Sequence, residues 1–237
     1  METYYHKNST KTTAKKAFIN SLPVMAGYIC LGIGFGVLLE SHGYSFLWAV
    51  LMSITIYAGS MQYVAVDLLS GGATLIATAL MTLMVNARHL FYSISMLENY
   101  KNMGKLKPLL AATLTDETYS LVCSKELLPE DIDEKKYYLF ISLMDQCYWV
   151  DGSAIGGLVG AAITFNTTGI EFAMTSLFVL IFVEQWESAN SHIPAILGVA
   201  CSLGCLLVFG SGNFLIPSMI CITIALLVFR KGAEKND

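Results

Sequence analysis

The sequence predicts an all-α integral membrane protein, a bundle of about eight transmembrane helices. Of its 237 residues, 55% are hydrophobic and only 14% are charged, and the mean hydropathy is +0.59. This is more apolar side chain than the interior of one soluble domain holds. The apolar residues also gather in segments that approach the roughly 20 residues a helix needs to cross a bilayer.

These segments define one transmembrane domain, residues 17–229, between polar tails at 1–16 and 230–237. They are residues 17–39, 46–69, 73–97, 109–123, 138–164, 172–186, 193–209 and 214–229. The first segment is longer than a signal-peptide core of about 7 to 15 residues, so we expect an uncleaved span. The fourth segment is short and carries Asp116 and Glu117. The alternative is therefore seven spans and one broken or re-entrant segment.

Lysine and arginine counts predict the orientation of the chain. With eight spans and a cytoplasmic start, the inner side holds four of these residues before the first span, three in 124–137 and three after 229. The outer side then holds only Lys101, Lys105 and Lys107. Seven spans with an outside start separate the charges less well, so the rule favours eight.

Two polar connectors, 99–107 and 125–136, divide the domain into halves, roughly 17–124 and 138–229. Glycines in the two halves align when one residue is inserted. The match is either an internal repeat, as is common in secondary transporters, or chance.

Composition and motifs exclude several functions. The net charge of -4, with basic residues scattered among short loops, gives no face for nucleic acid. The six cysteines show no Cys-x-x-Cys and no histidine at metal spacing, so we expect neither metal nor cofactor. The enzyme motifs His-Glu-x-x-His and Gly-x-Ser-x-Gly and a nucleotide-binding loop are missing from the sequence. A transporter is favoured, and a channel, a scaffold or, less so, an intramembrane enzyme are the alternatives.

Arg88 is the most informative residue, because it lies inside the third apolar segment between Asn86 and His89. A charge at the bilayer centre costs about 3 kcal/mol on insertion scales. Arg88 is about 14 Å of helix rise from Leu97, too far to reach the interface. It therefore faces the bundle interior, either to hold a carboxylate through two parallel hydrogen bonds or to form a structural ion pair.

Several carboxylates are candidate partners for Arg88. We favour Asp151, which precedes a small-residue stripe of Gly152, Gly156 and Gly160 and so would lie at a seam between helices. The substrate-binding candidates are Arg88, Asn86, His89, Asp151, Gln62 and Tyr57. The ion-coupling candidates are His89, Asp116, Glu117 and Asp145; for His89 the alternative is an ordinary hydrogen-bonded interior histidine.

Two segments carry residues that can interrupt a helix. The first contains Pro23, Gly27, Gly32, Gly34 and Gly36, which either open the helix or allow close packing. The second contains Tyr57-Ala-Gly-Ser-Met-Gln-Tyr63, a polar run in an aliphatic segment. This run is a candidate for a second unwound point, and we expect Gln62 to be satisfied either by another helix or by a substrate.

Four motifs together resemble those of the AzlC family. They are the run from Tyr57 to Tyr63, Asn86-Ala-Arg-His-Leu-Phe-Tyr92, Leu114-Thr-Asp-Glu117, and Leu22-Pro23 before a glycine-rich helix. The resemblance covers nearly the whole chain. It implies a multi-pass subunit in the bacterial inner membrane that exports branched-chain amino acids, with a small AzlD-type membrane subunit as its partner. Tyr57 and Met61 depart modestly from the family pattern, which leaves the substrate range open.

Overall fold

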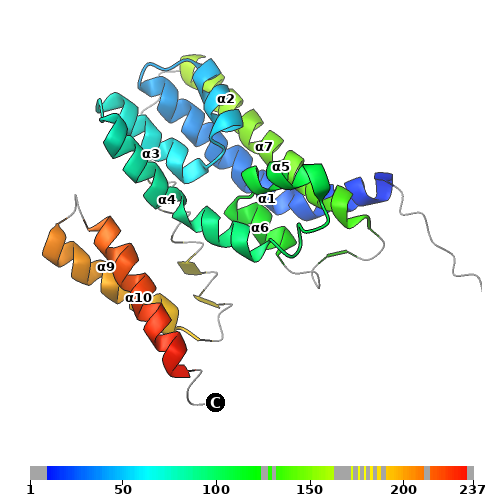
Figure 1. Ribbon diagram of the computed structural model, residues 1–237. Helices are drawn as coiled ribbons and strands as arrows, with labels where there is room; N and C mark the ends of the chain where they lie inside the picture. The colour runs from blue at the N-terminus through cyan, green and yellow to red at the C-terminus, as the bar shows by residue number, and fades with distance from the viewer. Residues whose placement is uncertain are drawn as a thin grey trace, which may run out of the picture. The chain divides into compact units, whose positions relative to one another are not determined.

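The computed structural model describes residues 10–123, 128–129, 132–162, 191–210 and 214–233, and seven single positions between 172 and 187. Two compact units, Met1–Met174 and Thr175–Asp237, are described separately. All regular structure in the described residues is helical, as predicted (Figure 1). The first unit contains α1 (Thr10–Ser41), α2 (Phe46–Thr55), α3 (Gly59–Ser70), α4 (Leu75–Ser95), η1 (Gly104–Leu106), α5 (Lys107–Ala112), α6 (Asp116–Val122) and α7 (Glu134–Ala162). In the second unit α9 (Ile193–Phe209) packs against α10 (Leu215–Ala233).

Large apolar side chains cover the outside of the described helices. Leu75 on α4 is 89% exposed and Leu207 on α9 is 87% exposed. Such surfaces are unfavourable in water and suited to hydrocarbon. Among the described helices, α1 is long and apolar enough to cross a membrane. Helix α4 consists of two parts, Leu75–Asn86 and Arg88–Ser95, which meet at a bend of 47°. Taken together as one span, these parts are also long and apolar enough to cross a membrane. The count of eight spans stays a prediction.

Helices α1 and α7 form the frame of the first unit and run parallel along each other (Figure 1). Their contacts advance together, from Thr13 beside Asp133 to Gly36 beside Gly157. The glycines make this approach possible. A Cβ at Gly36 would lie 2.3 Å from the Ser153 carbonyl oxygen, and one at Gly156 would lie 2.1 Å from that of Ile33.

The glycines of the first segment therefore serve packing where they meet α7. Helix α1 continues unbroken through Pro23 and the glycines after it, so the opening we considered for this segment is absent. The reason is that α7 holds α1 along its length, which outweighs the one backbone hydrogen bond that proline removes.

The second predicted span is instead a hairpin of two short helices, α2 and α3. Helix α2 starts beside Gly157 and descends to Gln146, whose side chain donates to the Ile54 carbonyl. The chain turns at Tyr57, which has a φ of 42°, and α3 runs back. Tyr63 on α3 donates to the Leu31 carbonyl oxygen at 2.8 Å. The candidate unwound point is present between α2 and α3, and the chain reverses direction there.

The fourth predicted segment is a second hairpin, formed by α5 and α6 with its turn at 113–115. Leu110 on α5 lies in a buried cluster with Ala17 and Tyr137, near the start of α1 and α7. Helix α6 then returns along α4 until Asn99 donates to the carbonyl of Cys123. The fourth segment is therefore broken, as in the alternative to eight spans. The second hairpin enters from the end where α1 and α7 begin, and the first enters from the opposite end.

The two hairpin turns meet midway along α1 and α7. Tyr28 of α1 contacts Thr115 in the second turn, and Ser60, just past the first turn, contacts Arg88 of α4. Three interruptions of regular helix thus converge: two turns and the bend of α4. The proposed repeat between halves stays a prediction, because residues 163–171, which carry part of the glycine match, lie outside the described residues.

The glycine seam can be tested by substitution. We expect Gly156→Ala to lower the free energy of unfolding by about 1–3 kcal/mol, because the new methyl meets the backbone of α1. Gly27→Ala is the matched control, since a Cβ there meets nothing within 4 Å. The measurement is the thermal unfolding midpoint of both purified variants in detergent. Equal midpoints would contradict the seam.

Candidate functional site

The site is built around Arg88, at the bend of α4. Its Nη1 donates to Asp116, in the first turn of α6, in an ion pair. Its Nη2 donates to the Ser60 hydroxyl on α3 at 2.5 Å. One guanidinium thus joins the turns of both hairpins. The side chains of Arg88 and Asp116 are 30% and 18% exposed, so the pair is only partly shielded.

The counter-charge is Asp116, one of the predicted candidates, and the preference for Asp151 is wrong. Asp151 is exposed on the far side of the glycine stripe of α7. Residue 151 directly precedes Gly152, but successive helix positions point about 100° apart, so a neighbour of a seam residue need not face the seam. The pair brings together α4 and α6, which are adjacent in space.

Beside this pair lies a continuous chain of buried hydroxyls between two carboxyls. Tyr28 donates to Glu117 Oε2 at 2.8 Å and lies 2.6 Å from the hydroxyl of Thr115. The hydroxyls of Thr115 and Thr118 are 3.0 Å apart, and Thr118 lies 2.7 Å from Asp145 Oδ2. Asp145 is fully buried and Glu117 is partly exposed. The chain links three helices, α1, α6 and α7.

Gln62 supports the first hairpin and is satisfied by protein groups. It is fully buried, donates to Ser53 at 3.2 Å and accepts from the indole N–H of Trp149 at 2.9 Å. Ser53 in turn donates to Ser153 at 2.9 Å. These bonds tie α2, α3 and α7 together. Of the two alternatives for Gln62, another helix rather than a substrate holds the amide.

The other predicted site residues lie near the pair without joining it. Tyr57, at the first turn, is buried, and its hydroxyl has no hydrogen-bond partner among the described residues. His89 Nδ1 lies 3.3 Å from the Asn86 carbonyl oxygen within α4. The carbonyl oxygen of the Asn86 side chain is buried and, in the described part of the chain, has no partner. No cluster of metal ligands occurs among the described residues.

Several site residues were missed by the sequence argument. Tyr28, Ser60, Thr115 and Thr118 supply hydroxyls to the two networks. Tyr92 and Tyr119 form a stacked pair, with ring centroids 4.8 Å apart, on the helices that carry Arg88 and Asp116. A signal existed for some of them: hydroxyl residues flank the two adjacent carboxylates, in Thr115-Asp-Glu-Thr118.

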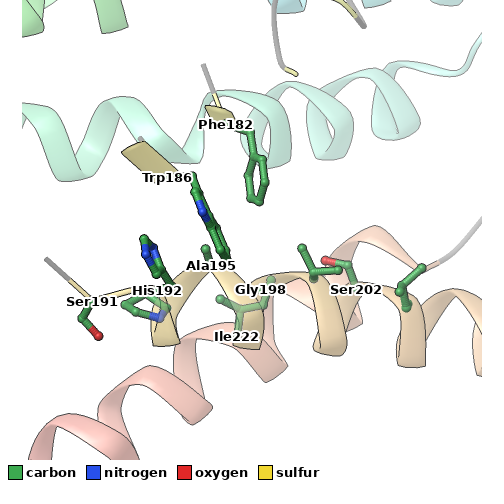
Figure 2. A pocket seen from close by; sticks show the side chains of 11 residues that line it. Phe182, Trp186, Ser191, His192, Ala195, Gly198, Ser202 and Ile222 are labelled. Carbon is green, nitrogen blue, oxygen red and sulfur yellow. The ribbon is translucent and has the colours of Figure 1, made fainter. Parts of the chain in front are cut away.

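The second unit contains a separate pocket of about 610 Å³ (Figure 2). The ring of Trp186 stacks on that of His192, with centroids 4.1 Å apart, and Gly198 and Ile222 lie on its α9 and α10 walls. The lining described is mostly apolar and carries no charged partner for a zwitterion. The charged groups of the first unit are therefore the stronger candidate site.

Comparison with known proteins places this geometry in a family. The family model described as "AzlC protein" matches residues 23–163. The Bacillus subtilis protein "Branched-chain amino acid transport protein AzlC" is 40% identical over 100% of this chain and 93% of its own length. A Haemophilus influenzae protein described as a membrane protein is 41% identical over 93% of this chain and 91% of its own. The Escherichia coli "Inner membrane protein YgaZ" is 26% identical over 90% of each chain. No solved structure matches significantly.

Proposed function

Because the chain belongs to the AzlC family, we propose that it is the large subunit of a secondary transporter that exports branched-chain or similar apolar L-amino acids. An ion gradient drives the export. The name of the Bacillus subtilis relative supports the substrate class. The Arg88–Asp116 pair, where two opposed hairpins meet, is the observation that carries the proposal. Helix breaks at the centre of a bundle are typical of transporter binding sites.

The ion pair is chemically complementary to a zwitterion. The substrate carboxylate takes the place of Asp116 on the Arg88 fork, in two parallel hydrogen bonds. Asp116, whose Oδ1 has no hydrogen-bond partner among the described residues, then accepts the substrate ammonium. Each protein charge exchanges one partner for another, so neither is left alone in a medium of low dielectric. The stacked rings of Tyr92 and Tyr119 offer an apolar wall for the aliphatic side chain.

Replacing Arg88 tests this binding role. We expect Arg88→Ala to abolish export. Arg88→Lys should lower it about tenfold to a hundredfold, since one lost charge-assisted hydrogen bond costs about 1.5–3 kcal/mol. Intracellular leucine, isoleucine, valine and methionine are measured in a dipeptide-fed host. The control is Lys101→Ala, which removes an exposed cation from a connector. Wild-type export by either Arg88 variant, at equal membrane abundance, would exclude the role.

The positions of the lysines support a proposal for the orientation in the membrane. With both hairpins re-entrant, the start of α1, the connector between α4 and α5, and the start of α7 lie at one end of the first unit. These segments hold all the lysines of the first unit that the structure describes, at positions 11, 15, 16, 101, 105, 107, 135 and 136. The connectors at the other end, 42–45 and 71–74, hold none. The positive-inside rule then makes the lysine-rich end cytoplasmic.

Cysteine labelling tests this orientation in intact cells, on a background without the six native cysteines. We expect Ser45→Cys to react with a membrane-impermeant maleimide added outside. Asn102→Cys should react only after the membrane is permeabilised. Both positions are exposed in the structure, so access is decided by the membrane side. The eight-span topology places residue 102 outside. Labelling of Asn102→Cys in intact cells would therefore support eight spans and contradict the re-entrant arrangement.

The small AzlD-type subunit completes the proposed multi-pass inner-membrane system. We expect export to fall when the host expresses this chain without that subunit, because the family resemblance implies a two-component assembly. The same amino-acid accumulation assay, run with and without the partner gene, measures the effect. Full export and counterflow by this chain alone would show that the partner is dispensable.

A further inference from the structure

The three hydroxyls between Glu117 and Asp145 do not carry enough protons to supply every hydrogen bond of the chain that they form. It has four links: Glu117 to Tyr28, Tyr28 to Thr115, Thr115 to Thr118, and Thr118 to Asp145. All four links are between 2.6 and 3.0 Å, so each needs a hydrogen between its oxygens. The three hydroxyls supply one proton each. The fourth proton must belong to one of the two carboxyl groups.

Among the described residues, no neighbouring group supplies this proton. The described titratable and charged groups that face the chain are Tyr57 at the turn between α2 and α3, Arg88 and Tyr92 on α4, Asp116 on α6 and Tyr137 on α7. None of them lies between two members of the chain. Tyr57 can donate a hydrogen bond to one of the hydroxyls from outside the chain. Such a bond does not change the number of hydrogens that lie between successive oxygens of the chain.

We propose that Glu117 and Asp145 share one proton, which passes between them through the hydroxyls of Tyr28, Thr115 and Thr118. The proposal deepens the ion coupling of the proposed function by naming the ion and its path. In one state Glu117 is protonated and every hydroxyl points toward Asp145. In the other, Asp145 is protonated and every hydroxyl points toward Glu117. Passage breaks four O–H bonds and forms four, and moves one proton from one carboxyl to the other.

The two ends of the chain differ in a way that suits this role. Glu117 is partly exposed and directly follows Asp116, so it is close to the charges of the substrate site. Asp145 is fully buried on α7, and its Oδ1 has no hydrogen-bond partner among the described residues. A proton can thus enter from the side of the substrate site and be held where solvent does not reach it.

The shared proton can be measured without transport. We expect infrared spectra of the purified wild-type protein at neutral pH to show the C=O band of a protonated carboxyl. The band should disappear in Glu117→Gln and also in Asp145→Asn. Either amide donates its own hydrogen to the chain, so the remaining carboxyl stays ionised. Glu98→Gln, an exposed carboxyl outside the chain, should leave the spectrum unchanged. A band that survives in either chain variant would overturn the proposal.

A second measurement covers the case in which those variants fail to fold. Thr118→Val removes the hydroxyl next to Asp145, whereas Thr118→Ser keeps it. In vesicles, we expect Thr118→Val to lower proton movement coupled to amino-acid movement about tenfold or more, with counterflow retained. Thr118→Ser should preserve both. Undiminished coupling in Thr118→Val overturns the proton path. If the wild type moves no amino acid, the transport proposal is refuted. The infrared result then decides by itself whether Glu117 and Asp145 share a proton.

Discussion

The placement of one guanidinium inside an apolar bundle constrains the rest of the first unit. Arg88 cannot reach the interface from its position on α4, so its charge must be met within the protein. Two of its partners, Ser60 and Asp116, come from the two hairpins, each just past its turn. The turns thus lie where the charge requires them.

A rigid frame makes this convergence possible. Helices α1 and α7 touch through glycines, so their backbones are fixed against each other. The first hairpin is then attached to α7 through Ser53, Gln62 and Trp149. Because α1 and α7 run parallel, the chain between them must return from the end of α1 to the start of α7. Helix α4 makes this return, whereas each hairpin turns back near the middle of the frame.

Helical class and the sites of interruption could be predicted from the sequence. The polar run beginning at Tyr57 and the carboxylates Asp116 and Glu117 marked both breaks, and Arg88 marked the centre. The direction of the chain after a break could not be predicted, because a hairpin of helices of 10 and 12 residues has the same hydropathy as one span. The partner of Arg88 also depends on packing. Local spacing favoured Asp151, whereas the tertiary fold brings Asp116 to α4.

The proposed substrate site and the proposed proton chain are adjacent, and this adjacency gives the proposed coupling a direction. A zwitterion adds no net charge when it enters between Arg88 and Asp116, so it changes the local field only through the placement of its two ends. Its ammonium, held by Asp116, brings a positive charge next to Glu117, which favours the ionised form of that carboxyl. The shared proton is then displaced toward Asp145. Substrate occupancy and proton position are thereby linked through residues that are neighbours in the sequence, Asp116 and Glu117, with no movement of a whole helix required for the first step.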